Sequence, residues 1–432
     1  MKKNLKYLAY LMPLIFFSSV YCSAKANIKK STINKATVIE LDGENTLQSL
    51  YTKRFIPREN LRKDLPVFNR SSDYISIRKE KGDITKPNMI LPSNYGSFNY
   101  PHTTSLVDSK SAPLNKSSKH AISSSKPYNA VGKILMVNNK GRVYSTCSGA
   151  LIGKAVVSTA ASCLADYGLN NNAKEVHFIP AATSDDSGPI GTWRADKLYI
   201  PACYKKGNCE SHSEGIVNAN NIALFTLKKN EIGQTPYDRG AHYLNYGWNN
   251  AGFTDSKDKF RIINVKKRAQ ISTLGYPEYL GNRRGNTGGS MIRTDSLAFV
   301  NIEKSKSGFG NKFEEYVWGS SKSTEGSDGS PIIINLGYQP YYDTWYLFAG
   351  RYTTPNVVVG NLGWAYMKTN RHVQGGSSFG QNASYPDEKY IDDQGINWGA
   401  GNIGFLMRKV CGYGQRYDHG QLNGICLKNI NR

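Results

Sequence analysis

The sequence predicts an all-β protein made of antiparallel strands. From residue 127 onward, short apolar runs follow one another and clusters of Gly, Asn, Pro and Ser separate them, which is the pattern of strands joined by turns. No long segment interrupts these runs with the apolar periodicity of an amphipathic helix. The 41 Gly and 28 Tyr residues among 432 also favour strands and turns. Together these features are typical of a sandwich or a barrel.

Residues 1–26 have the three parts of a secretory signal peptide. Three lysines stand among the first six residues, residues 7–20 form a short apolar run, and Ala24-Lys25-Ala26 provides small residues around a cleavage site. The apolar run is too short for a membrane-spanning helix. We therefore expect a secreted or periplasmic protein that is cut near Ala26 and has no membrane span.

Residues 27–126 are expected to form a leader, either a pro-segment or a linker, that is partly disordered. Apolar residues occur there only in short pairs, and Ser and Lys dominate residues 105–126. A segment of this composition buries too little apolar surface to offset the conformational entropy that folding removes.

The expected strands are short runs of aliphatic, β-branched and aromatic residues bounded by turn residues. They cover residues 130–137, 147–158, 175–179, 222–227, 271–275, 298–302, 331–335 and 345–349. Residues 371–432 are richer in Gly, Asn and Gln, and we expect them to form a small C-terminal extension with a cysteine loop.

The charge of the chain bears on its partners. Its formal net charge is +22, and such a surface attracts anions, so an anionic surface or a glycan is a possible partner. The basic residues are scattered along the sequence, and no nucleic-acid-binding module accompanies them. We therefore expect no specific nucleic-acid partner.

Six cysteines follow the signal peptide, and an even number in an exported chain fits disulfides. They are Cys147, Cys163, Cys203, Cys209, Cys411 and Cys426. Several connectivities are open, and pairing of sequence neighbours is the simplest. Cys203 and Cys209 together with His212 have a loosely ligand-like spacing, but a disulfide is favoured, so we expect no metal and no other cofactor.

Three separated segments carry the signal for function. In chain order they are CSGALIG with VSTAASC at residues 147–153 and 157–163, NNIAL at residues 220–224, and GSDGSP at residues 326–331. They resemble C-S-G-T-L-I with T-A-A-H-C, N-D-I-A-L, and G-[DNS]-S-G-[GS]-P of the trypsin-like serine proteases, in the order that this family has. The resemblance covers roughly residues 127–370.

This resemblance implies a double six-stranded antiparallel β-barrel, with a disulfide between Cys147 and Cys163 beside the catalytic histidine. It also implies that all three catalytic positions are substituted. The histidine slot holds Ser162, the acid slot holds Asn221, and the nucleophile slot holds Asp328.

The substitutions remove the chemistry of the family. A serine hydroxyl is not a base near pH 7, an asparagine cannot stabilise an imidazolium, and an aspartate is a poor acyl-transfer nucleophile. The resemblance places the backbone N–H groups of Gly326 and Asp328 at the oxyanion-hole slot, where the Asp328 carboxylate would repel a developing oxyanion. The sequence therefore predicts a catalytically inactive homologue that binds a protein or peptide ligand.

Further details resemble the bacterial glutamyl-endopeptidase-like branch of the family. These are PYNAVG at residues 127–132, TLGYP at residues 273–277, and Ser330 in place of a second Gly. Lys322 falls near the place where the family has the floor of its specificity pocket, although a surface lysine is the simpler interpretation.

Two alternatives stay open. The chain could be an active trypsin-like endopeptidase with displaced groups, in which Ser327 or Ser330 attacks and His177 or His212 acts as the base. In the other alternative the barrel is only a scaffold, and the function lies in the basic leader or in the C-terminal cysteine loop.

Overall fold

A computed structural model of the chain describes most of residues 122–412 and short parts of the leader. The described residues are 37–40, 74–75, 102–107, 122–138, 141–169, 172–183, 186–210, 219–255, 267–277, 279–280, 283–284, 290–304, 312–319, 326–337, 354–368, 371–392, 395–412 and 426. The chain divides into two units, Met1–Thr32 and Ile33–Arg432. The expected signal peptide and the expected strand at 345–349 lie outside the described residues.

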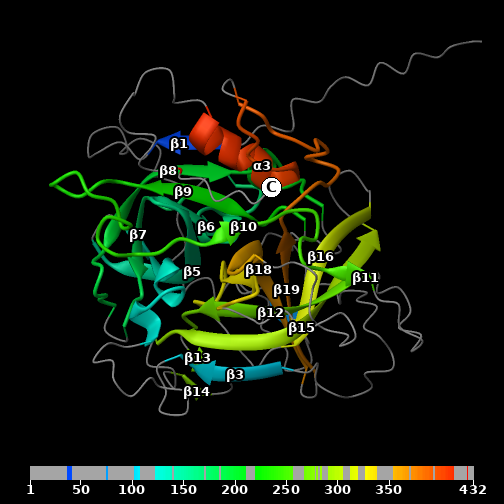
Figure 1. The fold of residues 1–432 in the computed structure, drawn as a ribbon, viewed down its shortest axis with the longest axis horizontal. Coiled ribbons are helices and arrows are strands. Elements are labelled where there is room, and N and C mark those ends of the chain that lie inside the picture. Colours follow the sequence, from blue (N-terminus) through cyan, green and yellow to red (C-terminus); the bar gives the residue numbers. More distant parts are fainter. Residues whose placement is uncertain are drawn as a thin grey trace, which may run out of the picture. The chain divides into compact units, whose positions relative to one another are not determined.

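The first barrel contains six antiparallel strands among the described residues (Figure 1). They are β4 (Val131–Val137), β5 (Val143–Gly153), β6 (Val156–Thr159), β7 (Glu175–Pro180), β8 (Trp193–Ile200) and β9 (Ala223–Leu227). They pair in the order β8-β7-β4-β5-β6-β9, and an additional pairing between β8 and β9 closes the barrel.

The second barrel is built in the same way from six described strands. They are β12 (Lys267–Gly275), β15 (Ile292–Lys304), β16 (Lys312–Gly319), β17 (Pro331–Ile334), β18 (Val357–Lys368) and β19 (Arg371–Ser378). They pair in the order β12-β17-β18-β19-β16-β15, and the pairing of β12 with β15 closes the barrel. The prediction of a double six-stranded antiparallel β-barrel is therefore confirmed.

The helices and the remaining strands are short. The helices in the described residues are α2 (Ala202–Lys206), α3 (Gly401–Met407), η3 (Ile122–Ser124), η4 (Tyr128–Ala130), η5 (Ala161–Cys163) and η6 (Arg408–Gly412). The small strands outside the leader are β10 (Asn245–Tyr246), β11 (Thr254–Asp255), β13 (Tyr279–Leu280) and β14 (Arg283–Arg284). None of the helices in the described part of the chain is long and apolar enough to cross a membrane.

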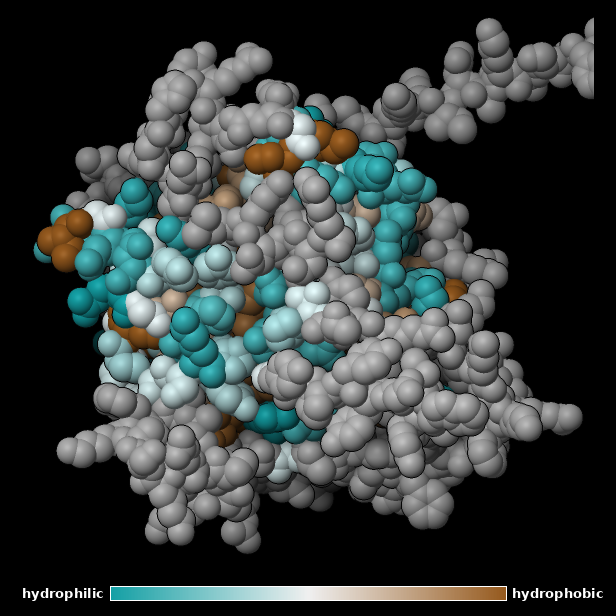
Figure 2. Space-filling model, in the orientation of Figure 1, coloured by the Kyte–Doolittle hydropathy of each residue, from teal (hydrophilic) through white to brown (hydrophobic). Residues whose placement is uncertain are grey.

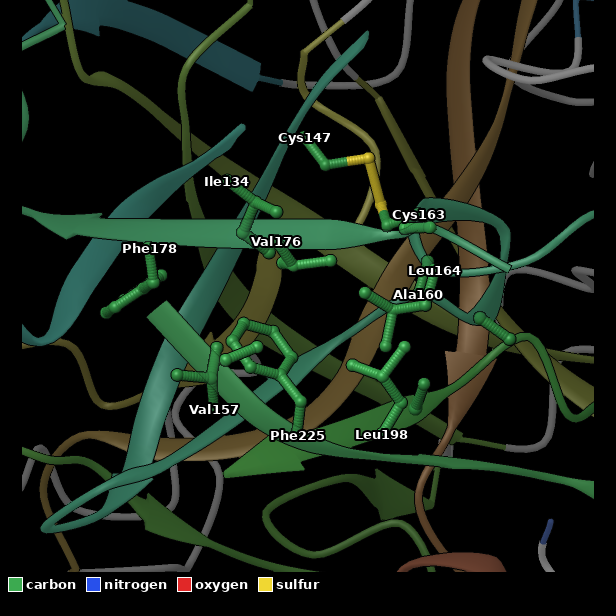
Figure 3. Packing of buried hydrophobic residues seen from close by; sticks show 14 of the residues in the cluster. Ile134, Cys147, Val157, Ala160, Cys163, Leu164, Val176, Phe178, Leu198 and Phe225 are labelled. Atoms are coloured by element: carbon green, nitrogen blue, oxygen red, sulfur yellow. A yellow bond between two sulfur atoms is a disulfide. The ribbon is translucent and has the colours of Figure 1, made fainter. Parts of the chain in front are cut away.

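Apolar side chains form one core inside each barrel and a third core between them. Inside the first barrel, Phe178 and Phe225 meet edge to face with 6.3 Å between their ring centroids (Figure 3). The inter-barrel cluster takes residues from both barrels, for example Leu224 and Leu274, and from α3, including Ile403. Each such fully buried side chain contributes about 1.5–3 kcal/mol. The inter-barrel cluster therefore holds the two barrels and the segment after them together.

The described residues present a mainly hydrophilic surface on the face drawn in Figure 2. On the face drawn in Figure 2, hydrophobic residues form separate spots among hydrophilic ones. The large hydrophobic side chains that are exposed in the described residues are Val143, Leu169, Ile232, Tyr237 and Ile391. Single exposed residues of this kind are normal for a folded protein.

The structure changes two expectations about the ends of the domain. The leader contributes three strands, β1 (Thr37–Glu40), β2 (Tyr74–Ile75) and β3 (His102–Leu106), each of which pairs with a barrel strand. The sequence analysis expected no strand there, because apolar residues occur in the leader only in short pairs. At the other end, β19 completes the second barrel although it lies beyond the boundary expected at residue 370.

Candidate functional site

Three elements bring Ser162, Asn221 and Asp328, the residues expected at the catalytic slots, together between the barrels. Ser162 lies in η5, directly after β6, and Asn221 lies two residues before β9. Asp328 lies in a turn that leads into β17. All three residues are 1% exposed. The three side chains therefore lie inside the fold.

Hydrogen bonds connect the three side chains into one chain of donors and acceptors. The Ser162 hydroxyl donates to the Asp328 carboxylate. The Asn221 amide donates through Nδ2 to Ser162 Oγ over 3.3 Å, and Asn221 Oδ1 accepts from the Ser162 backbone N–H over 2.9 Å. The backbone N–H of Asn221 donates in turn to Ser377 Oγ over 2.9 Å. Both barrels thus contribute to a single buried network.

The direction of this network is opposite to that of a catalytic triad. In a triad, the nucleophile donates to the histidine and the histidine donates to the acid. Here Asn221, which is expected in the acid slot, donates to Ser162, and Ser162 donates to Asp328. Asp328, which is expected in the nucleophile slot, therefore accepts at the end of this series. Asp328 has no hydroxyl to attack a carbonyl carbon, and Ser162 has no lone pair basic enough to take a proton near pH 7.

Backbone contacts fix the turn that carries Asp328. Ser148 donates from its N–H to the Asp328 carbonyl over 2.8 Å and from its hydroxyl to the Gly326 carbonyl over 2.7 Å. Gly329 has a φ of +79°, and a Cβ there would lie 2.1 Å from Thr159 Oγ1. Only glycine fits this position without a shift of its neighbours. The sequence motif is thus explained by the shape of the turn.

Disulfides support the site and the loops around it. The Cys147–Cys163 bond joins β5 to η5, next to Ser162. Cys203–Cys209 closes a small loop around α2, and Cys411–Cys426 closes the C-terminal loop. Each disulfide joins two cysteines that follow one another in the order of the six cysteines along the chain. Cys147, Cys163 and Asp328 form the one group of potential metal ligands close together in the described residues. Because both sulfurs are in a disulfide, this group offers no thiolate to a metal ion.

The groups of the displaced-nucleophile alternative have other partners. The Ser330 hydroxyl donates to the Ser327 carbonyl over 2.6 Å, inside the turn. Ser327 and Ser330 are 3% and 2% exposed. His177 lies on β7, where its Nε2 is 2.7 Å from Glu175 Oε1. His212 lies outside the described residues, as does Lys322.

The sequence analysis missed two buried carboxylates near the slots. Glu315 of β16 is fully buried and accepts the indole N–H of Trp364 over 2.9 Å. The Trp364 ring lies so close to Gly375 that a Cβ there would be 2.0 Å from it. A glutamate in an apolar strand and a Gly-Gly pair in a later one were the only signals of this arrangement.

The second buried carboxylate belongs to Glu210. It accepts hydrogen bonds from the Ser384 hydroxyl at 3.0 and 3.1 Å and from Asn220 Nδ2 at 3.3 Å. Burial raises its pKa above the ordinary value of a glutamate, and hydrogen bonds from its backbone, Ser384 and Asn220 oppose part of this rise. Through this cluster the segment after β19 is anchored to the residue next to Asn221.

Comparisons with known proteins give structural likenesses only. No protein-family model and no curated protein matches the chain. Among solved structures, the chain is similar to the thermostable serine protease AL20 from an extremophilic microorganism, with 18% identity, a TM-score of 0.39, and coverage of 58% of this chain and 92% of that chain. It is similar to the protease Anisep from Arthrobacter nicotinovorans, with 19% identity, a TM-score of 0.40, and coverage of 59% and 91%. A Glu endopeptidase has 16% identity, a TM-score of 0.36, and coverage of 60% and 89%.

Proposed function

We propose that this chain is a secreted, catalytically inactive homologue of the trypsin-like serine proteases that binds a protein or peptide ligand. The observation that carries the proposal is the reversed hydrogen-bond direction from Asn221 through Ser162 to Asp328. The near-complete burial of all three side chains supports it as well. Three disulfides fit an exported protein.

The magnitude of the chemical defect supports inactivity. Removal of one triad member costs about 10⁴-fold or more in rate, and an enzyme without a triad keeps only about 10³–10⁴-fold over the reaction in water. This chain has replaced all three members. The carboxylate of Asp328 adds a negative charge beside the place where an oxyanion would form. The residual rate is negligible for peptide cleavage.

Binding does not need these side chains. An extended peptide can add to the edge of a sheet through backbone hydrogen bonds, and side-chain pockets then give specificity. The structure itself contains extended segments added to barrel strands, because β1, β2 and β3 pair with β8, β18 and β15. The barrels therefore have strand edges that accept such a segment.

A fluorophosphonate probe tests the inactivity. We expect no labelling of the purified full chain under conditions in which trypsin is labelled completely. Rebuilding the slots with Ser162→His, Asn221→Asp and Asp328→Ser is expected to restore some labelling, because the surrounding turn is retained. Labelling of the natural chain would contradict the proposal. Its loss in Ser327→Ala or in Ser330→Ala would then identify the displaced nucleophile.

Selection from displayed random dodecapeptides tests the binding. We expect enrichment of extended sequences that bind the natural chain and the rebuilt variant alike, because the slots do not contribute to strand addition. No enrichment on the natural chain or on a variant with residues 102–107 disabled, from a library that enriches ligands for a peptide-binding control domain, would contradict the proposal.

A further inference from the structure

The three leader strands occupy equivalent places in the fold. Each leader strand pairs with the part of a barrel strand that extends beyond its pairing with the neighbouring strand of the barrel. In β15, residues 298–304 pair with β16, and residues 292–296 pair with β3. Since β12 pairs with β15 on its other side, β3 and β16 lie on the same side of β15. On β18, the pairing with β17 ends at Asn361. Further along, residues 365–366 of β18 pair with β2 on the side opposite β19. Without the leader, these backbone groups would form open strand edges.

The pairing of β3 with β15 is the best anchored of the three. Its register runs over five residue pairs, from Ile292↔Leu106 to Ser296↔His102. At its centre, the hydroxyls of Thr104 and Thr294 are 3.0 Å apart and hydrogen bonded. The backbone N–H of Val107 then donates to the Met291 carbonyl over 3.0 Å. The leader is therefore held by main-chain bonds over the whole stretch.

A buried side chain adds an anchor to these backbone bonds. Val107 is only 4% exposed and belongs to the inter-barrel cluster, together with Met291 and Tyr276. Extended backbone with one aliphatic anchor is the usual form of a peptide that adds to a sheet edge. The segment 102–107 thus has the features of a peptide ligand that is covalently attached to its own receptor.

We infer that Met291 and residues 292–296 of β15, here named the β15 edge, form a peptide-docking site that leader residues 102–107 occupy as a built-in ligand. The chemistry that it fits is an extended segment with a hydroxyl residue opposite Thr294 and an aliphatic residue three positions later. This inference rests on the proposed function and gives the binding site a location and a regulator. An external peptide has to displace the leader before it can bind.

The tether determines how strongly the leader competes. A segment on a short flexible linker presents itself at about millimolar effective concentration. A free peptide whose dissociation constant for the open edge is about 10 μM would therefore bind the natural chain about 100-fold more weakly than a chain whose own strand is disabled. Proteolysis of the leader, or its capture by another protein, would open the site.

The test uses the full chain and a fluorescein-labelled peptide with the sequence of residues 99–110. In the variant Thr103→Pro/Thr104→Pro/Val107→Asp, the leader loses a main-chain donor and its apolar anchor, so the β15 edge is vacated. We expect this variant to bind the peptide, measured by fluorescence polarisation, about 100-fold more tightly than the natural chain. Equal affinity for the two chains would overturn the inference. So would equal affinity of the variant for the natural peptide and for a peptide with Val107→Asp.

A second form of the protein keeps the test decisive if the variant does not fold. A site for a specific protease replaces residues 111–117, and the natural leader is cut after folding. The peptide is expected to exchange into the cut protein and not into the uncut protein, and failure to enter the cut protein would overturn the inference. The fluorophosphonate experiment has an independent readout, so failure of the docking site and failure of the inactive-homologue proposal are distinguishable.

Discussion

The Ser162 hydroxyl donates a hydrogen bond to the Asp328 carboxylate, although 166 residues separate the two in the chain. A catalytic base and nucleophile are related in the opposite way, because the nucleophile donates to the base. The contact also joins η5 of the first barrel to the turn before β17 of the second. Two residues that the sequence analysis places at catalytic slots thus link the two barrels.

This link makes Ser162 a residue of structural importance. Ser162→Ala leaves the buried Asp328 carboxylate without this donor, and we expect a loss of about 1–3 kcal/mol in the free energy of unfolding. Asp328→Asn keeps an acceptor and should cost less. Guanidinium denaturation measures both, with the exposed Ser187→Ala as the control, which should stay within about 0.5 kcal/mol of the natural chain. Equal free energies of unfolding for Ser162→Ala and Ser187→Ala would contradict the prediction.

The buried Glu210 makes stability depend on pH. Burial raises its pKa in the folded state above the ordinary value of 4.5. The folded state therefore binds this proton more tightly than the unfolded state, and its contribution is present below pH 4.5 and lost as the pH rises through the folded-state pKa. Glu210→Gln removes this dependence. We expect the variant to gain stability relative to the natural chain between pH 4.5 and 8.

Unfolding by guanidinium at several pH values measures this difference, with Glu388→Gln at an exposed position of the later segment as the matched control. If the stability of Glu210→Gln relative to the natural chain falls as the pH rises, the prediction is contradicted.

The junction between leader and barrel is fixed by one asparagine. Asn129 Nδ2 donates to the carbonyls of Ser124 and Gly240 over 3.1 and 3.0 Å, and its Oδ1 accepts from the His242 backbone N–H over 3.0 Å. Asn129→Ala removes all three bonds, and we expect a loss of about 2–4 kcal/mol. Thermal unfolding checks it against Asn138→Ala, where a local turn bond from the Arg142 backbone N–H is lost. A smaller decrease in melting temperature for Asn129→Ala than for Asn138→Ala would contradict the prediction.

The sequence predicted the strands and slots whose side-chain pattern is strong. The runs at 130–137 and 175–179 became β4 and β7, because aliphatic residues there fill the first barrel. The motif spacing predicted where Ser162, Asn221 and Asp328 lie in the fold, and the structure brings these three together. Such motifs are readable because they follow from turn geometry, as the contacts of Gly329 illustrate.

Other features depend on contacts that no local pattern encodes. The strand β19, with the sequence RHVQGGSS, has little β propensity, and it is a strand because β16 and β18 lie on either side of it. The leader strand β3 is equally polar and depends on the open edge of β15. The direction of the hydrogen bonds around Ser162 and the burial of Glu210 also arise only from tertiary packing.

The pair formed by Trp364 and Glu315 gives a final prediction. The indole N–H donates to a carboxylate, and both residues are fully buried, so Trp364→Phe removes a hydrogen bond to an ionisable group and leaves a small void against Gly375. Hydrogen bonds to charged groups contribute about 1.5–3 kcal/mol, against about 0.5–1.5 kcal/mol for neutral ones. We therefore expect Trp364→Phe to lower the free energy of unfolding by about 2–4 kcal/mol.

The matched control is Trp193→Phe, because the Trp193 indole N–H donates over 3.3 Å to the neutral carbonyl of Ile190. Its loss in guanidinium denaturation should be smaller than that of Trp364→Phe by about 1 kcal/mol or more. Glu315→Gln keeps an acceptor for Trp364 and should fall between the two. If Trp193→Phe is the more destabilising variant, the carboxylate of Glu315 is not what holds Trp364 in its buried position against Gly375 of β19.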